Sequence, residues 1–274
     1  MLIFSLAATL SLTPAFSVSE QANPKAKEMV VVSIPENARD LGNGVYDLGF
    51  KVHDGQIVQG TLYVFSDKQF AKPDGTPGNG PRGGGGEETS TCYSYITKGA
   101  KWRTEESWAI STHMAPGNYV TSIIAGAISE WENADNPAHD IMASLDTGLT
   151  VDVNSIGNSM NDQNEVAFGD IDENGVIAAT WVWRTVGGPP SQRYIAEWDQ
   201  VYDVVSFSWT NDVTINPNSM DFDNIATHEV GHAVGMGHPD STCTLETMYA
   251  YASNGETIKQ DLYTGDIAGV NGLY

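Results

Sequence analysis

Three histidines and one glutamate stand at fixed spacing in the run HEVGHAVGMGH, residues 228–238. On an α-helix, residues four apart lie on one face, so His228 and His232 could bind the same metal ion. His238 must reach that ion from outside the helix, so the helix has to end before it. Gly235 suits this end, because a helix C-terminus commonly needs a residue in the left-handed conformation. Three neutral histidines leave the fourth position of a tetrahedral zinc ion open, which is typical of a catalytic site.

Glu229 is offset by about 100° around the predicted helix from His228. At that angle its carboxylate could accept a proton from a water on the metal instead of binding the metal itself. The spacing therefore predicts one catalytic Zn²⁺ per chain, with Glu229 as general base. The competing interpretation is an amphipathic helix with core histidines. The pattern HExxH arises by chance in roughly one comparable chain in a hundred, and the added glycine and third histidine lower this to about one in a hundred thousand, which disfavours that interpretation.

Hydrophobic periodicity indicates the elements that must position this run. Short, largely apolar runs predict strands at 108–113, 176–183 and 194–204, and helical spacing predicts an amphipathic helix over 118–133. Further upstream, residues 29–70 alternate in the manner of strands, with Asp54-Gly55 as a hairpin-like turn. The range 71–91 is rich in glycine and proline and predicts a flexible, cleavable linker.

The tripeptide Thr247-Met248-Tyr249 follows His238 by about ten residues. Together with HExxHxxGxxH it resembles the metzincin clan of zinc endopeptidases, in which a methionine turn lies beneath the zinc. The tail LYTGDIAGVNGLY, residues 262–274, looks like the closing helix of the matrixins, the matrix-metalloproteinase-like family of that clan. Residues 221–227 resemble the family's lead-in to the active-site helix, with Asp221 or Asp223 as N-cap.

The resemblance implies an α+β metzincin-type catalytic domain over 92–274, with a twisted mixed β-sheet, a long helix and an active-site helix. It also implies that the strand at 176–183 is a sheet edge along which an extended peptide adds as a further strand. The small β-rich segment 18–70 in front of this domain is either a removable pro-segment or a retained accessory module. The implied activity is that of a secreted endopeptidase acting on extracellular proteins.

Two departures from the matrixin pattern stand beside the matches. Pro239 follows the third histidine, where many matrixins have serine and where proline is typical of the serralysin branch. Gly265 precedes Asp266 where matrixins often carry two acids. The first of those acids typically forms a salt bridge with the new N-terminus after activation, and Gly265 has no side chain that could form it.

The chain has two cysteines, which in a secreted protein suggest one disulfide between Cys92 and Cys243. The rival is a cysteine switch, in which a pro-segment thiolate binds the open zinc position. The family motif for such a switch is PRCGxPD, and the residues around Cys92 read Thr-Cys-Tyr-Ser. The disulfide is therefore the prediction.

The segment Asp170-Ile-Asp172-Glu-Asn174-Gly175 has the opening of a calcium loop. Trp181 occupies the twelfth position, where an EF-hand needs a bidentate glutamate, so an EF-hand is excluded. Two interpretations stay open: a structural Ca²⁺ held by Asp170, Asp172 and Asn174, or an ordinary turn that joins two strands.

The composition limits the classes of molecule that the chain is expected to bind. The 35 acidic and 13 basic residues give a formal net charge of -22, which argues against binding nucleic acid or an anionic membrane. Residues 1–17 contain an apolar run followed by small residues and predict a signal peptide, with an apolar first strand as the alternative. We therefore expect a secreted, extracellular monomer that acts on polypeptide substrates and has no membrane anchor once the signal is removed.

A protein of another class would share most of these features. A catalytically silent, secreted peptide-binding protein could keep the metzincin fold and hold peptides along its edge strand. The intact Glu229 speaks against this alternative, because silenced enzymes commonly lose the general base.

Overall fold

The computed structural model describes residues 30–70, 91–134, 139–152, 155–157 and 159–274. The predicted signal peptide at 1–17 and the range 71–90 of the predicted linker lie outside the described residues. Among the helices that are described, none has both the length and the apolar character needed to cross a bilayer.

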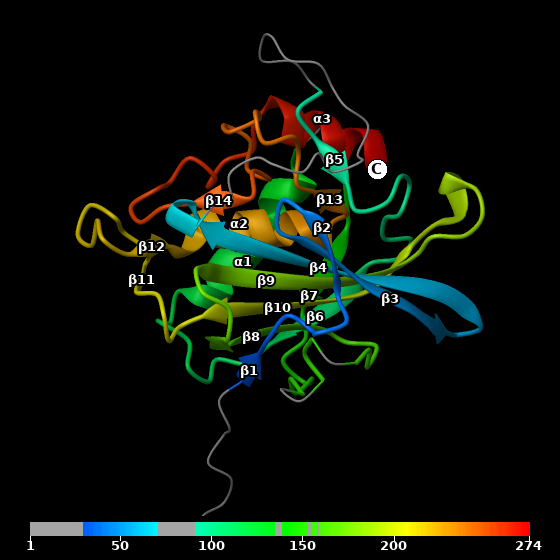
Figure 1. The fold of residues 1–274 in the computed structure, drawn as a ribbon, viewed down its shortest axis with the longest axis horizontal. Coiled ribbons are helices and arrows are strands. Elements are labelled where there is room, and N and C mark those ends of the chain that lie inside the picture. The colour runs from blue at the N-terminus through cyan, green and yellow to red at the C-terminus, as the bar shows by residue number, and fades with distance from the viewer. Residues whose placement is uncertain (1–29, 71–90, 135–138, 153–154, 158) are drawn as a thin grey trace, which may run out of the picture.

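One mixed sheet dominates the structure (Figure 1). Within the described residues it has ten strands, eight of them in the order β2-β3-β4-β9-β10-β8-β6-β7, while β1 pairs with β8 and β14 pairs with β4. The strands are β1 (Val30–Val32), β2 (Arg39–Gly42), β3 (Val45–His53), β4 (Gln56–Asp67), β6 (Glu106–Ile110), β7 (Met142–Leu145), β8 (Asn164–Ile171), β9 (Val176–Thr185), β10 (Ile195–Asp203) and β14 (Tyr251–Ala252).

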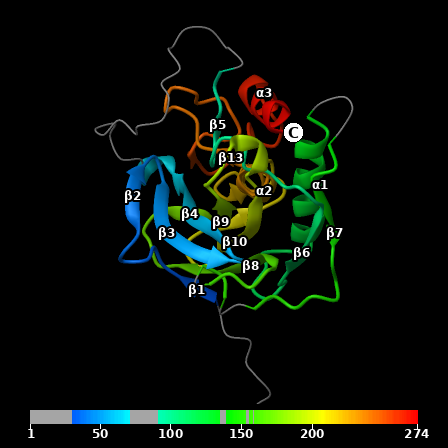
Figure 2. The same cartoon turned by 90° about the vertical axis from the view of Figure 1, so that its right-hand side faces the viewer.

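Three α-helices are described, and α1 and α2 lie within the curve of the twisted sheet (Figure 2). They are α1 (Val120–Glu132), α2 (Phe222–Ala233) and α3 (Thr264–Leu273). Short elements complete the described chain: the 3-10 helices η1 (Lys68–Phe70) and η2 (Pro190–Gln192), the pair β11 (Trp209–Thr210) and β12 (Met220–Asp221), and the pair β5 (Ser94–Tyr95) and β13 (Met236–Gly237).

This architecture confirms the predicted α+β class with a mixed sheet, a long helix and an active-site helix. The strands predicted at 108–113, 176–183 and 194–204 correspond to β6, β9 and β10, and the helix predicted over 118–133 is α1. Every residue of β9 is buried. A strand covered on both faces has no solvent side, which accounts for its nearly continuous apolar run.

The N-terminal strands belong to this same sheet. The hairpin of β3 and β4 turns at Asp54 and Gly55, whose φ angles of 47° and 74° fit the left-handed positions of a two-residue hairpin turn. Strand β4 then pairs antiparallel with β9 from Val58 to Ser66. The predicted β-rich character of this segment is therefore confirmed.

The prediction that the strand at 176–183 is a free sheet edge is wrong for this structure. Strand β9 has β10 on one side and β4 on the other. The resemblance concerned the catalytic region alone, and alternation within 56–65 could not indicate which strand this segment would join.

Two hydrophobic clusters hold the layers together. The larger lies between the sheet and helices α1 and α2, and includes Phe65, Trp131 and Met248. The smaller covers the opposite face of the sheet, where Val30 and Val32 of β1 pack near Leu62 and Trp181. Strand β4 contributes to both clusters, because alternate side chains of a strand point to opposite faces. Both faces of β4 therefore pack against apolar neighbours.

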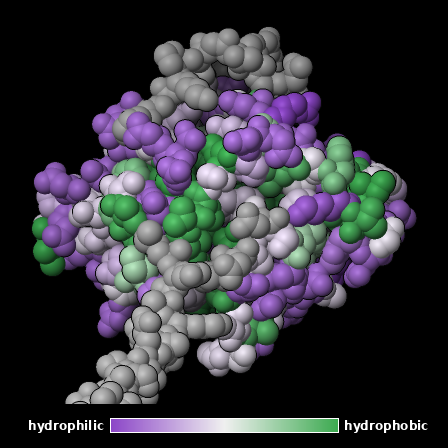
Figure 3. Space-filling view, turned by 60° about the horizontal axis from the view of Figure 1, so that its bottom comes forward, coloured by the Kyte–Doolittle hydropathy of each residue, from purple (hydrophilic) through white to green (hydrophobic). Residues whose placement is uncertain are grey.

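The acidic residues are divided between the surface and the interior, where Glu165, Glu197 and Asp199 are among the buried ones. Figure 3 shows one face, on which hydrophilic side chains surround a smaller hydrophobic area near the centre. The exposed acids fit a solvated surface, which is the simplest explanation of their contribution to the charge of -22.

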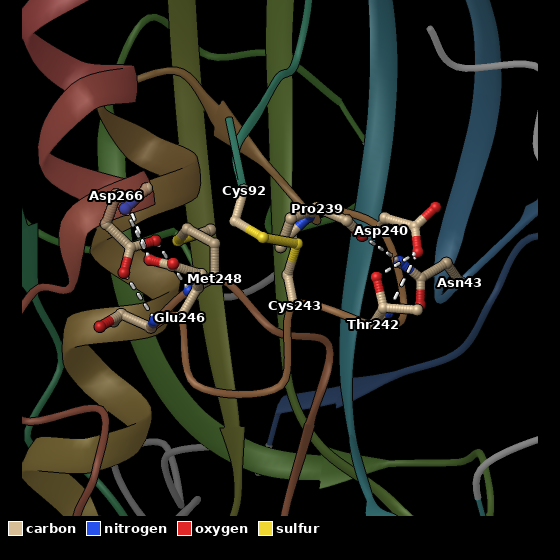
Figure 4. Close-up of a disulfide and its surroundings, with 11 residues drawn as sticks. Asn43, Cys92, Pro239, Asp240, Thr242, Cys243, Glu246, Met248 and Asp266 are labelled. Carbon is tan, nitrogen blue, oxygen red and sulfur yellow. Dashed lines mark hydrogen bonds between the residues drawn. A yellow bond between two sulfur atoms is a disulfide. The ribbon is translucent and has the colours of Figure 1, made fainter. Parts of the chain in front are cut away.

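A disulfide joins Cys92 to Cys243, with a Cα–Cα distance of 5.6 Å (Figure 4). It ties the chain just before β5 to the loop that follows His238, and the two cysteines are 151 residues apart in sequence. A crosslink over so long a loop greatly restricts the unfolded chain.

We expect replacement of both cysteines by serine to lower the free energy of unfolding by about 2 to 5 kcal/mol, since the unfolded state regains the freedom of the long loop. Urea denaturation of the oxidised wild type, the reduced wild type and the double variant measures this. The reduced wild type should match the variant, and an unchanged unfolding midpoint in both would contradict the prediction.

Candidate metal centre

Helix α2 carries two of the three histidines, and its ends are fixed by side-chain chemistry. Asp221 is the N-cap, and its Oδ1 accepts the backbone N–H of Asn224 at 2.9 Å. At the other end Gly235 has φ 110°, and its N–H donates to the carbonyl of His232 at 3.0 Å. The chain can therefore turn sharply and bring His238 back toward the helix.

The three imidazoles converge through their Nε2 atoms. His238 Nε2 lies 3.1 Å from Nε2 of His228 and 3.1 Å from Nε2 of His232. Each Nδ1 faces a backbone carbonyl oxygen: that of Thr247 at 2.6 Å for His228, of Met236 at 2.9 Å for His232, and of Asn43 at 2.7 Å for His238. A carbonyl oxygen only accepts, so each Nδ1 must donate. All three Nε2 atoms are then lone-pair acceptors directed at one point.

Burial keeps the three imidazole rings uncharged, which is the form that binds a metal ion. His228 and His232 have no exposed surface. Burial lowers the pKa of both well below the usual value, and it lowers the pKa of His238 to about 4. At neutral pH all three are thus uncharged, as metal ligation requires.

The geometry fits zinc. Ligands at 2.0–2.1 Å in a tetrahedron stand about 3.3 Å apart, close to the 3.1 Å between these nitrogens. Three buried acceptors facing one another also need a cation among them. Within the described part of the chain, His228, His232 and His238 are the one group of three or more ligating side chains close enough to share an ion.

Glu229 lies next to these ligands and is fully buried. Its Oε2 accepts a hydrogen bond from Thr180 Oγ1 of β9, while Oε1 has no partner. Burial raises the pKa of this carboxyl to about 8. One oxygen is therefore oriented by the sheet and the other is left for an additional partner. The bond to Thr180 was not foreseen, because no local pattern links residues so far apart in sequence.

Met248 lies against α2 on the side of Gly231. It is fully buried, and a Cβ atom at Gly231 would overlap its sulfur and the ring of Trp131. Trp131 in turn donates through Nε1 to the carbonyl of Thr227 at 2.8 Å. The methionine turn thus packs directly against the helix that carries His228 and His232, and the place of Met248 beneath a zinc ion stays a prediction.

A pair of buried carboxyls holds that turn in place (Figure 4). Asp266 accepts the backbone N–H of Thr247 at 2.7 Å and that of Met248 at 3.2 Å. Glu246 accepts the N–H groups of Gly265 and Asp266 at 3.0 and 3.1 Å, at the start of α3. Because the Thr247 carbonyl binds His228, this network connects α3 to the metal site. The sequence singled out Asp266 only as part of the tail pattern.

The N-terminal segment also reaches the site, and sequence reasoning missed this. Tyr63 stacks on the ring of His232 at 4.1 Å between centroids, and Phe65 stacks on His228 at 3.8 Å. The Asn43 carbonyl is the partner of His238. Alternation identified residues 56–65 as a strand but contained no signal for the side chains it would contact.

The predicted calcium residues lie away from the histidines. Asp170 is in β8, and Asp172 and Asn174 are exposed in the turn that leads from β8 to β9. The N–H of Asp172 donates to the carbonyl of Val32 at 2.8 Å, and Gly175 has φ 82°. The segment forms a turn between two strands, which is one of the two interpretations that the sequence left open. The other, a loop that binds Ca²⁺, stays a prediction.

Comparison with known proteins bears on the same region. The family model described as Matrixin matches residues 98–274. A search of curated proteins found no match.

We expect Met248→Ala to lower the free energy of unfolding by about 2 to 5 kcal/mol, because it leaves a cavity under α2. Met248→Leu keeps most of the volume and should cost less than about 1.5 kcal/mol. Chemical denaturation of both variants measures this. Equal losses for alanine and leucine would show that packing beneath the helix is not the cause.

The Glu246 and Asp266 pair should make stability depend on pH. Burial and the neighbouring Asp266 raise the pKa of Glu246 to about 7 from 4.5. The folded chain therefore binds more protons than the unfolded chain between these two values. The contribution of Glu246 to stability is full below the lower value and declines as pH rises through the higher one.

Glu246→Gln removes this titration, so the variant should lose less stability than the wild type between about pH 4.5 and about pH 8. Unfolding free energies across this range, with the exposed Glu105→Gln as a control of equal charge change, measure the difference. Parallel curves for wild type and Glu246→Gln would count against the assignment.

Proposed function

The chain belongs to the matrixin family, and on that basis we propose that it is a secreted zinc-dependent endopeptidase that hydrolyses peptide bonds of extracellular proteins. The observation that carries the proposal is the convergence of three Nε2 atoms beside a buried carboxylate with one free oxygen. Three ligands leave a fourth position for water, and the carboxylate is next to them.

His228, His232 and His238 would hold the metal. Bound zinc supplies a Lewis acid that acidifies a water and polarises the scissile carbonyl. Glu229 accepts the proton of the attacking water at its free oxygen, Oε1, and then delivers it to the leaving amine. Glu229 would be held in its ionised form by a cation bound to the three histidines, which would offset the effect of burial on its pKa. The hydrogen bond from Thr180 keeps the carboxylate oriented during both transfers.

Secretion, the monomeric state and the lack of a membrane anchor belong to the same proposal. A disulfide between Cys92 and Cys243 supports an oxidising compartment. The charge of -22 supports a soluble chain that repels nucleic acids and anionic lipid.

Zinc-loaded Glu229→Gln should bind zinc as the wild type does and lose peptide hydrolysis by a factor of about 100 or more. His238→Ala should lose both zinc and activity, because two imidazoles remain. Zinc content by elemental analysis and cleavage of a quenched fluorescent peptide library measure this, before and after chelation and before and after proteolytic removal of the residues upstream of 91.

Restoration of chelated wild-type activity by added zinc is expected. Wild-type turnover in Glu229→Gln would refute its role as general base. Stoichiometric zinc with no cleavage by any form of the wild type would favour the silent peptide-binding protein.

A further inference from the structure

Strands β9 and β10 both present polar side chains to helix α2, which lies over their shared face of the sheet (Figure 2). The two strands pair antiparallel, and Thr180 of β9 is directly opposite Gln200 of β10. Side chains of directly opposite residues lie on the same face of a sheet. For Thr180 that is the face toward α2, because its hydroxyl donates to Oε2 of Glu229. Gln200 therefore lies beside the hydrogen bond that orients Glu229.

The side-chain amide of Gln200 is held at its oxygen. Oε1 accepts a hydrogen bond at 3.0 Å from the hydroxyl of Tyr202, two residues on and on the same face of the strand. Burial and the charge of Glu229 raise the pKa of Tyr202 well above the usual value of a phenol, so this hydroxyl keeps its proton and donates it. The Tyr202 ring packs against Phe222 of α2, at 5.0 Å between centroids. With Oε1 turned toward Tyr202, the amide nitrogen of Gln200 points away from it.

That nitrogen has no hydrogen-bond partner within the described residues. Gln200 has no exposed surface, and its Nε2 is one of the buried polar atoms that are left unpaired. A buried donor without a partner lowers stability, and an apolar side chain of similar size would fill the same space without this cost. The acceptor on the directly opposite residue is the hydroxyl oxygen of Thr180. The amide is thus placed to act on that hydroxyl.

The hydroxyl of Thr180 needs such a partner to have a fixed direction. A threonine hydroxyl has one proton and two acceptor sites, and it rotates about its C–O bond. A donor beside it decides the rotation, because the hydroxyl proton must point away from an incoming N–H group. We propose that Gln200 is a positioning residue: its Nε2–H group donates to Oγ1 of Thr180 and thereby commits the hydroxyl proton to Glu229. The proposal deepens the endopeptidase function and rests on it.

This arrangement fixes which oxygen of Glu229 takes part in proton transfer. Oε2 accepts the hydrogen bond from Thr180, so the proton of the attacking water goes to Oε1, the oxygen without a partner. Without Gln200 the hydroxyl of Thr180 is free to turn toward a backbone carbonyl, as threonine side chains commonly do. The carboxylate then loses its fixed orientation. An interaction of this kind acts on the chemical step, so its loss lowers kcat and leaves KM unchanged.

The experiment compares zinc-loaded full-length wild type with Gln200→Met, which keeps the length of the side chain and removes its donor. The matched control is Val201→Ala, a buried position one residue on and on the opposite face of the sheet. Thr180→Val and Thr180→Ser, each alone and combined with Gln200→Met, complete double-mutant cycles. The values of kcat and KM are measured with a quenched fluorescent peptide, in whichever form the wild type cleaves it, with or without the residues upstream of 91.

A second measurement does not depend on activity. The ¹⁵N–¹H signals of the Gln200 side-chain amide are recorded by NMR on the zinc-loaded chain and identified by their absence from Gln200→Met. In Thr180→Val the acceptor is missing, so the signal of the bound amide proton should move upfield. In Thr180→Ser the hydroxyl is kept, and the signal should stay close to its wild-type position.

We expect Gln200→Met to lower kcat by about 10-fold with KM and zinc content unchanged. In the Thr180→Val background the same substitution should have no further effect, because the hydroxyl on which it acts is gone. In the Thr180→Ser background it should again cost about 10-fold. Val201→Ala should unfold at a lower denaturant concentration than the wild type and keep its kcat.

The possible failures are distinguishable. A folded Gln200→Met with the kcat of the wild type would overturn the proposal. So would an equal loss of kcat in the Thr180→Val background, or an amide signal that does not move in Thr180→Val. If the wild type cleaves nothing in either form and the amide signal moves as expected, the contact of Gln200 with Thr180 stands and the endopeptidase is rejected. If the wild type cleaves nothing and the signal stays in place, both fail.

Discussion

The rest of the structure depends on one electrostatic constraint: three imidazole lone pairs must face one another in a buried site. They can do so only if every Nδ1 donates elsewhere, and the three acceptors are carbonyls of Thr247, Met236 and Asn43. Those carbonyls come from the methionine turn, from the turn after α2 and from the N-terminal segment. Each must be held firmly, because an imidazole that rotates loses its ligand geometry. Three features help to hold these carbonyls in place. They are the N-cap of α2, the packing of Met248 against Gly231, and the hydrogen bonds that Asp266 accepts from the methionine turn.

The sequence alone predicted the features that depend on residues close together in the chain. The spacing of His228, Glu229 and His232 depends only on helical periodicity, and the turn at Gly235 depends only on backbone sterics. The strands β9 and β10 follow from short apolar runs, and the helix α1 follows from apolar residues at helical spacing. These features could be predicted because residues near in sequence determine them.

Contacts between distant segments could not be predicted in this way. Nothing in the alternation of residues 56–65 indicates that Phe65 meets His228, or that Thr180 of β9 would orient Glu229. The same is true of the sheet edge, since any strand of suitable length and apolar faces can add to β9. The sequence limited the N-cap of α2 to Asp221 or Asp223. The choice of Asp221 depends on the backbone conformation before Phe222.

The disulfide has a further consequence for the region where matrixins typically fix their new N-terminus with an acid. Here that acid is replaced by Gly265, whose missing side chain leaves room for the backbone of Cys92: a Cβ there would overlap the Cys92 carbonyl oxygen. The bond to Cys243 fixes this stretch covalently. Unlike a salt bridge, a disulfide does not weaken when ionic strength or protonation changes, but thiols can reduce it. The redox state of the surroundings, more than their salinity or acidity, would then control how firmly the chain entering the catalytic region is held.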